Sequence, residues 1–330
     1  MSRLYPDGAL LLAPLSGYTD LPFRRSVRRH GCRFAFTEMI DAAALVYARA
    51  RTENMLTRGA DESWLGVQLV SADAAHLKRA VTILNGYEFD VVDFNLGCPV
   101  PKVTKKGAGA ALGQDVDRAL ELFSIIAEGS RFPVTAKIRI LDRSDPEPTL
   151  RLVRGLAARG ARALTVHGRL RAEFYSGEPA YGMIETVARE LTVPVIGNGG
   201  VFGRASFDLM REGCPSAAGV MIARGAMGNP WIFSELADPD FMPPTVDELV
   251  DEAGRHVEDI FDFYGEERGG PLARKIVLDY FRGRGFNGEW RGRAGSLSTR
   301  AEYREYLASA PRFHSSDYWK NPPADRFIRG

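Results

Sequence analysis

The segment VVDFNLGCPVPKVTKKGAGAAL, residues 91–112, indicates the fold class of this chain. It begins with a short apolar run, VVDF, and breaks abruptly at GCP. This pattern predicts a buried parallel strand whose carboxyl end turns directly into a loop. Cys98, the cysteine of GCP, is therefore expected at the mouth of the barrel or sheet to which the strand belongs.

The loop behind Cys98 is basic and rich in glycine. Its charged and small residues are Lys102, Lys105, Lys106, Gly107 and Gly109. Lysines without a nearby carboxylate suit a polyanion, and the glycines allow hinge-like backbone motion. A cysteine after a strand is most often a small buried hydrophobe. The flanking glycine and proline, together with Asn95 and the basic loop, favour a chemical role for Cys98 instead.

Strand-like and helix-like segments alternate through most of the chain. Eight apolar runs cover residues 9–15, 34–40, 64–70, 91–97, 134–140, 163–169, 194–200 and 217–225. The helix-like segments between them cover residues 21–30, 72–85, 115–128, 149–159, 181–191 and 204–212. Eight such repeats predict an α/β fold, a TIM (β/α)8 barrel. A doubly wound sheet is the alternative, but no GxGxxG motif follows the first strand.

After the eighth strand the pattern becomes helical. Residues 245–264 have helical spacing with Thr245 and Glu248 as a capping box, and further helices are expected at 271–282 and 298–308. A glycine- and arginine-rich connector covers residues 283–295, and the last dozen residues are expected to be irregular. We therefore predict a TIM-barrel catalytic domain at residues 1–238 and a smaller all-α helical domain at residues 239–330.

The composition is that of an ordinary soluble globular protein, with 45% apolar and 26% charged residues in a chain of 330. The first residues lack the features of a signal peptide, and no apolar run reaches the length of a membrane span. The three cysteines, Cys32, Cys98 and Cys214, form no CxxC pair. We therefore expect reduced thiols, a cytoplasmic location, no metal site and no membrane partner.

Charge is unevenly distributed along the chain. From Arg268 to Gly330 there are 13 Lys and Arg against 6 Asp and Glu, a net of +7, which leaves −6 for the preceding residues. A basic tail suits a protein that holds a large polyanion, although a solvated basic surface without a partner fits equally well. Arginines interleaved with Phe286 and Trp290 in the connector suit RNA if the rings are exposed. The alternative is that both rings pack on the preceding helices.

Each predicted strand ends in candidate site residues, most of them polar or reactive. They are Pro14 and Ser16, Glu38, Gln68, Asn95 and Cys98, Lys137 and Arg139, His167, Asn198, and Arg224. In a TIM barrel these ends share one face and line a single pocket. So many polar groups on apolar strands need a ligand to satisfy them. The glycine-rich ends IGNGGV (196–201) and MIARGAMGNP (221–230) suit a phosphate held by backbone amides and Arg224.

Six stretches of the sequence resemble the tRNA-dihydrouridine synthases, flavoproteins that reduce uridine in tRNA. They are APLSGYTDLPFR (13–24), DFNLGCPVPKVTKKGAGAAL (93–112), AKIR (136–139), TVHGR (165–169), PVIGNGGV (194–201) and GVMIARGAMGNPWIF (219–233). Residues 264–275 also resemble the helical tail of the bacterial members. Leu15 stands where methionine is common, and Gly200 stands where an acidic residue is common, which alters the local ribityl or phosphate contact.

The resemblance implies FMN in the barrel mouth, NADPH or NADH as the reductant, and tRNA as the partner. We also expect a monomer without an obligate protein partner. By position, the resemblance implies that FMN is held by Pro14, Leu15, Ser16, Gln68, Lys137, His167, Asn198, Gly199, Gly200, Arg224 and Gly225. Substrate contacts are expected from Asn95, Arg139, Tyr175, Lys105, Lys106, Arg282, Arg284, Arg291 and Arg293. Cys98 takes the role of the acid that protonates C5 of uracil after hydride reaches C6.

Two other functions fit parts of the sequence. A barrel flavoenzyme that acts on a free pyrimidine, like the dihydroorotate dehydrogenases, needs neither the basic tail nor the lysine-rich loop. An RNA-binding protein built on an inactive barrel does not need Cys98, Lys137 and His167. The sequence therefore favours an enzyme that reduces tRNA.

Overall fold

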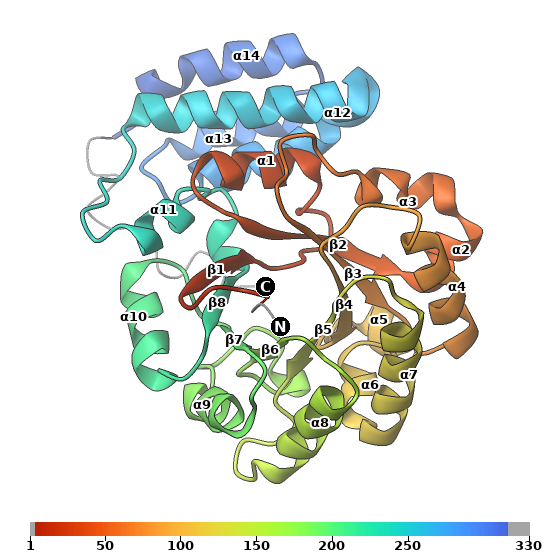
Figure 1. Ribbon diagram of the computed structural model, residues 1–330. Coiled ribbons are helices and arrows are strands. Elements are labelled where there is room, and N and C mark those ends of the chain that lie inside the picture. The colour runs from red at the N-terminus through yellow and green to blue at the C-terminus, as the bar shows by residue number, and fades with distance from the viewer. Residues whose placement is uncertain (1–3, 316–330) are drawn as a thin grey trace. The chain divides into compact units, whose positions relative to one another are not determined.

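A closed barrel of eight parallel strands forms the centre of the first part of the chain (Figure 1). The computed structural model describes residues 4–315, so the expectation for the last dozen residues lies outside it. The strands are β1 (Ala9–Leu12), β2 (Phe34–Asp41), β3 (Leu65–Val70), β4 (Val91–Leu96), β5 (Val134–Arg139), β6 (Leu164–His167), β7 (Val195–Asn198) and β8 (Gly219–Ile222). Because β1 pairs with β8, the sheet closes and the predicted TIM barrel is confirmed over the doubly wound alternative.

Four strands begin at the predicted residue, the other four begin one or two residues later, and several end earlier than predicted. Every residue of β3 and β4 is buried, as expected for parallel strands covered on both faces. β1 ends at Leu12 and β8 at Ile222, because the last residues of each predicted run leave the sheet and form the loops that carry polar groups. The carboxyl ends of the eight strands therefore share one end of the barrel, called here the carboxyl-end face.

Helices follow the strands around the barrel. They are α2 (Ala42–Tyr47), α3 (Arg49–Leu56), α4 (Ala74–Leu84), α5 (Pro101–Thr104), α6 (Ala110–Gln114), α7 (Val116–Gly129), α8 (Glu147–Ala158), the 3-10 turn η1 (Arg171–Glu173), α9 (Tyr181–Glu190) and α10 (Arg204–Gly213). The short helices α5 and α6 occupy the stretch after Cys98 that the sequence predicted as an open loop. Side-chain caps at Asp41, Asp73 and Asp115 start α2, α4 and α7.

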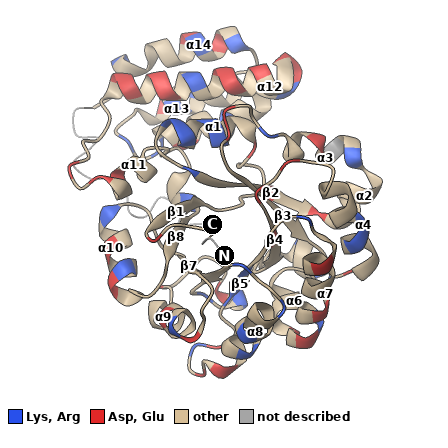
Figure 2. Cartoon of the chain, in the orientation of Figure 1, with Lys and Arg blue, Asp and Glu red and all other residues tan. Residues whose placement is uncertain are grey.

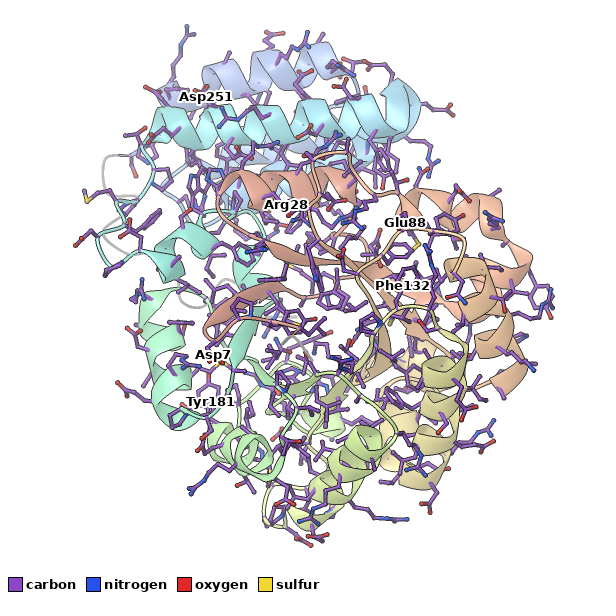
Figure 3. All side chains as sticks on the ribbon, in the orientation of Figure 1. Asp7, Arg28, Glu88, Phe132, Tyr181 and Asp251 are labelled. Atoms are coloured by element: carbon purple, nitrogen blue, oxygen red, sulfur yellow. The ribbon has the colours of Figure 1, made fainter. Side chains whose placement is uncertain are left out.

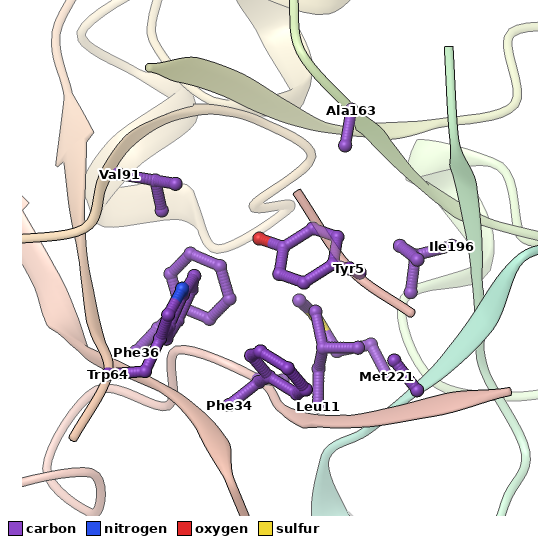
Figure 4. Close-up of a cluster of buried hydrophobic side chains, with 11 residues drawn as sticks. Tyr5, Leu11, Phe34, Phe36, Trp64, Val91, Ala163, Ile196 and Met221 are labelled. Atoms are coloured by element: carbon purple, nitrogen blue, oxygen red, sulfur yellow. The ribbon is translucent and has the colours of Figure 1, made fainter. Parts of the chain in front are cut away.

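An aromatic cluster fills the amino-terminal end of the barrel. Figure 4 shows Tyr5 surrounded by buried side chains from strands on several sides. The Tyr5 ring meets Phe34 edge-on at a centroid distance of 5.4 Å and lies 5.6 Å from Trp64. Aromatic rings of this size bury much apolar area and exclude water from the barrel floor. The carboxyl-end face is thereby left as the end where polar groups meet.

The chain divides into two compact units, and the barrel strands belong to the first. The second unit comprises Leu21–Cys32, Phe202–Arg204 and the chain from Arg224 onward. Its helices are α1 (Leu21–Arg29), η2 (Arg224–Ala226), α11 (Ile232–Ala237), α12 (Val246–Phe281), α13 (Gly288–Arg293), η3 (Ala294–Ser296), α14 (Arg300–Ser309) and η4 (Ala310–Phe313). The division at residues 238 and 239 stays a prediction, and the contacts add α1 and residues 224–238 to the helical part.

Helix α12 corresponds to two of the predicted helices. Its backbone departs from helical geometry at Gly265, where φ is 75°, and this kink separates residues 246–264 from the continuation toward Phe281. Thr245 and Glu248 form the expected capping box at its start. No helix among residues 4–315 combines the length and apolarity that crossing a lipid bilayer requires.

The connector at residues 283–295 is folded rather than extended. Trp290 is buried and stacks on Tyr306 with ring centroids 4.2 Å apart, and Phe286 lies 4.7 Å from Phe281. Of the two alternatives, packing therefore holds for both rings. Arg284 is only 2% exposed, so it is also removed from the predicted set of surface contacts with RNA.

A buried carboxylate joins α1 to α12 within the second unit. Glu252 accepts hydrogen bonds from Arg29 and from the Ser26 hydroxyl, and it pairs with His30 at 3.3 Å. Burial opposes ionisation of Glu252, but the hydrogen bonds from His30 and Arg29 outweigh it and lower the pKa to about 2. Glu252 is therefore held as an anion inside the helical packing.

Candidate active site

Four side chains from three neighbouring strands form a hydrogen-bonded row near the carboxyl-end face. Asn95 Nδ2 donates to Gln68 Oε1 at 2.7 Å, and Gln68 Nε2 donates to Asp93 Oδ2 at 2.7 Å. The second oxygen of Asp93 accepts from the Thr135 hydroxyl at 2.7 Å. The strand register places Gln68 beside Asp93 and Asp93 beside Thr135, so parallel pairing brings these three side by side, and Asn95 lies two positions further along β4.

The direction of this row is set at both ends. Asn95 Oδ1 accepts from the backbone N–H groups of Gly97 and Cys98 at 3.1 and 2.9 Å. Backbone N–H groups can only donate, so the Asn95 oxygen faces them and its amide nitrogen faces Gln68. At the other end an ionised Asp93 can only accept, which requires the Gln68 amide nitrogen to face it. Burial raises the pKa of Asp93 to about 6, against the hydrogen bonds from Gln68 and Thr135.

Cys98 lies directly after β4, where Asn95 anchors its backbone. It is partly exposed, whereas Cys32 and Cys214 are buried. Burial of its surroundings raises the pKa of the Cys98 thiol, although the Val100 backbone amide and the charge of Lys137 act in the opposite direction. The thiol therefore carries its proton at neutral pH, which is the form that a general acid needs.

Lys137 reaches across the barrel end from β5. Its Nζ donates to Asn198 Oδ1 at 2.8 Å, and Asn198 Nδ2 donates to the Met221 carbonyl on β8 at 2.7 Å. Burial lowers the pKa of Lys137 to about 8, with the nearby charge of Arg139 adding to the effect. Lys137 therefore places a positive charge at the carboxyl-end face, and an anion bound beside it would raise the lowered pKa again.

The end of β7 has a backbone that only glycine adopts readily. Gly199 and Gly200 have φ values of 124° and 75°. A Cβ on Gly199 would lie 2.8 Å from the His167 ring, and one on Gly200 would lie 2.8 Å from the Tyr181 hydroxyl. Tyr181, labelled in Figure 3, donates to the Gly199 carbonyl at 3.2 Å. Within the described residues, no acceptor pairs with the backbone N–H of Gly199 or Gly200.

Arg139 has a role that differs from the predicted contact with uracil. It is 3% exposed, and its three nitrogens donate to the backbone carbonyls of Gly97, Leu170 and Phe174 at 2.8, 2.9 and 2.7 Å. Burial lowers its pKa to about 10. Arg139 therefore braces the Cys98 segment against the loop after β6, and a uracil contact from this side chain stays a prediction.

The remaining predicted residues of the first unit lie at strand ends or in loops around the same face. The segment Pro14, Leu15 and Ser16 follows β1, and the Leu15 amide donates to the Thr19 hydroxyl at 3.0 Å. His167 ends β6 and contacts Arg169 NH1 through Nε2 at 3.2 Å. Lys105 and Lys106 are exposed after α5, and Lys106 pairs with Asp41 at 2.8 Å.

Other predicted residues belong to the second unit. Arg224 lies over the Phe202 ring at 5.4 Å, and Gly225 follows it in η2. Among the tail arginines, Arg282 and Arg293 are exposed, and Arg291 is half-buried with Nε donating to the Phe286 carbonyl. Arg300 and Arg304 are paired with acidic residues of α12, whose ribbon has several red segments in Figure 2.

Sequence reasoning missed four residues that organise the site. They are Asp93, Thr135, Arg169 and Phe174. A carboxylate inside an apolar strand run is the signal that could have found Asp93, because a buried charge requires partners. No comparable signal marks Thr135 or Phe174, since their roles depend on partners far away in the sequence.

Comparisons with known proteins agree with one another. The family model described as Dihydrouridine synthase (Dus) matches residues 11–314. A probable tRNA-dihydrouridine synthase of Rickettsia conorii is 33% identical over 309 residues, covering 91% of this chain and 92% of that protein. A probable tRNA-dihydrouridine synthase of Rhodobacter capsulatus is 35% identical over 286 residues, with 83% and 86% coverage. The tRNA-dihydrouridine synthase B of Pasteurella multocida is 31% identical over 279 residues, with 83% and 84% coverage.

Proposed function

The chain belongs to the dihydrouridine synthase family, and from this premise we propose that it reduces uridines of tRNA to 5,6-dihydrouridine with FMN as cofactor. The observation that carries the proposal is the anchoring of Cys98. Asn95 accepts from the Cys98 backbone amide and is itself fixed through Gln68 to Asp93, while the thiol remains partly exposed and protonated. A site built around one reachable, protonated thiol suits a reaction that needs an acid.

The residues at the carboxyl-end face fit a flavin with a phosphate tail. The unpaired amides of Gly199 and Gly200 offer two backbone donors to an anion, in a backbone where a Cβ would collide with its neighbours. Lys137 offers a donor for the ring, and Pro14, Leu15, Ser16, His167 and Asn198 lie at the ends of the surrounding strands. Gln68 is fully buried and its amide is shared between Asn95 and Asp93, so its contact with the flavin stays a prediction. Arg224 and Gly225 are proposed as further contacts with the phosphate.

The reduction adds one hydride and one proton to the C5=C6 bond of uracil. When bound, FMN supplies the hydride for C6, after NADPH or NADH has reduced the flavin. Cys98 gives its thiol proton to C5, and the resulting thiolate regains a proton from solvent. The positive charge of Lys137, which is held beside Asn198, would stabilise negative charge that develops in the site during the reduction.

The uridine must leave its stack to reach the barrel. A base inside folded tRNA is not accessible to a group at a strand end, so the nucleotide has to rotate outward into the site. We assign the contacts with the RNA backbone to the exposed lysines Lys105 and Lys106 and to the tail arginines that remain exposed. The helical tail then holds tRNA while the barrel carries out the reduction.

Replacement of Cys98 tests the proposal. Cys98→Ala should keep flavin and its reduction by NADPH, and should lower dihydrouridine formation by about 10²–10⁴-fold, the usual contribution of a general acid. Cys214→Ala is the matched control, because that thiol is buried and donates a hydrogen bond to the Met210 carbonyl. Full turnover of tRNA by Cys98→Ala removes Cys98 from the mechanism. A wild-type protein that reduces free orotate or uracil but not tRNA overturns the substrate assignment.

A further inference from the structure

Two aromatic rings stand exposed on the loop after β6. This loop, residues 170–178, is called here the β6 loop. Phe174 is 43% exposed and its neighbour Tyr175 is 46% exposed. Large aromatic side chains normally bury most of their surface, so two adjacent exposed rings at the carboxyl-end face require a reason.

The backbone at Phe174 is strained. Among residues 4–315 it is the only non-glycine residue with a positive φ, at 49°, and its ψ is −98°. A side chain with a Cβ disfavours this region, and phenylalanine has no polar group that would form a local hydrogen bond in compensation. Strain of this kind persists only where the surroundings enforce it, and it gathers at functional sites.

Two buried arginines enforce the conformation. Arg139 donates to the carbonyls of Leu170 and Phe174, and Arg169 donates to those of Ser176 and Gly177 at 2.9 and 2.6 Å. The two side chains are 3% and 5% exposed, and burial lowers the pKa of both. Desolvating two cations is unfavourable unless hydrogen bonds replace the lost water. The buried side chains of Arg139 and Arg169 therefore hold the backbone of the β6 loop in this conformation through their hydrogen bonds.

The same brace reaches the reacting segment. Arg139 Nε donates to the Gly97 carbonyl, the residue before Cys98, at 2.8 Å. Its guanidinium carbon also lies 5.7 Å from the centre of the Tyr175 ring, within range of a cation–π contact. One buried side chain thus connects the exposed rings with the backbone at Cys98.

We propose that Phe174 and Tyr175 form a stacking surface for unpaired nucleobases next to the uridine that is reduced. The inference rests on the proposed function, because rotating one nucleotide outward leaves its neighbours without a stacking partner. Aromatic rings accept any base face, and the guanidinium behind Tyr175 strengthens the attraction. Rigid rings lose little conformational freedom when a base binds, which explains why the loop is held in a strained form.

Replacing Phe174 by alanine and by glycine separates the ring from the strain. Both variants lose the ring, and only glycine accepts a positive φ without penalty. Phe174→Gly should therefore melt a few degrees higher than Phe174→Ala. Both should bind an unmodified tRNA transcript about five-fold or more weakly in fluorescence anisotropy, at one fixed salt concentration. Phe174→Tyr keeps a ring and should bind as the wild type does.

Tyr47→Ala is the matched control, since Tyr47 is an aromatic side chain 67% exposed on α2. It should leave tRNA affinity unchanged. The inference is overturned if Phe174→Ala and Phe174→Gly bind tRNA like the wild type. It is also overturned if the affinity of the two variants follows their melting temperatures, because the ring would then act only through folding. Dihydrouridine formation by the wild type is measured separately, so a protein that binds tRNA without reducing it refutes the proposed function and leaves the stacking test intact.

Discussion

The Asn95 side-chain amide donates to the Gln68 amide oxygen over 2.7 Å, joining β4 to β3 across 27 positions of sequence. This bond lies in the middle of a row that runs from Thr135 through Asp93 to the backbone at Cys98. Amide groups can rotate by half a turn and exchange donor for acceptor. Here the Asp93 carboxylate requires the Gln68 amide nitrogen to face it, and the backbone N–H groups of Gly97 and Cys98 require the Asn95 oxygen to face them. Both requirements are met by one orientation of the two amides.

Asp93→Leu should disturb this row, whereas Asp93→Asn should preserve it. Leucine leaves the buried Gln68 amide without an acceptor, which costs about 1–3 kcal/mol of unfolding free energy. Asparagine can accept from Gln68 with its oxygen and donate to Thr135, whose hydroxyl can reverse. Denaturant unfolding measures stability, and the rate of iodoacetamide labelling reports Cys98, the one partly exposed cysteine of the chain. Equal stability and equal labelling of the two variants would show that Asp93 does not orient the Gln68 and Asn95 side chains.

The stability of Asp93→Asn relative to the wild type should depend on pH. The folded-state pKa of Asp93 is raised to about 6, so between the unfolded value near 4 and pH 6 the folded protein binds more protons than the unfolded chain. Wild-type stability therefore loses a contribution on the order of 3 kcal/mol as pH rises through this range. The asparagine variant lacks this titration, and its advantage should grow from pH 4 to 6 and stay constant above. A difference that does not change with pH contradicts the raised pKa.

Glu252→Gln should destabilise the second unit. Removing the buried carboxylate takes its pair from His30 and leaves Arg29 with Asp259 as its remaining carboxylate, which costs about 3 kcal/mol. Because the folded-state pKa is lowered to about 2, this stabilisation is complete above pH 4.5 and declines as pH falls toward 2, so the deficit should shrink in acid. Glu258→Gln is the control, since its pairs with Arg300 and Arg304 are partly exposed to solvent and should each contribute less than about 1 kcal/mol. Equal losses in the two variants would refute the distinction.

Replacing an exposed tail arginine should change tRNA affinity, whereas replacing a buried one should change folding stability. Arg282→Ala and Arg293→Ala remove exposed charges, so tRNA affinity should fall and its salt dependence should flatten by about one unit of slope for each lost phosphate contact. Arg284→Ala removes a buried side chain and should lower the melting temperature instead. Titrations of tRNA at several salt concentrations, with melting curves for each variant, distinguish the classes. A normal melting temperature combined with a flattened salt dependence of tRNA affinity in Arg284→Ala would show that Arg284 contacts the RNA after all.

The sequence determined the barrel and the end of it that carries the chemistry. Eight apolar runs with helix-like segments between them permit few arrangements, and parallel strands place all their carboxyl ends together. Cys98, Lys137, His167 and Asn198 were predicted because each is a polar or reactive residue at the end of an apolar run. That information is local, since it depends on the residue and on the few positions before it.

Only the tertiary structure decided which groups those residues contact. The Asp93 row depends on the register of β3, β4 and β5, and the Arg139 brace depends on carbonyls 31 to 42 positions away. Composition likewise did not distinguish exposed Arg282 from buried Arg284, because the path of the chain around Phe281 and Trp290 sets their burial. Hydrogen bonds depend on distance and direction in space, and neither quantity is encoded in the spacing of residues along one strand.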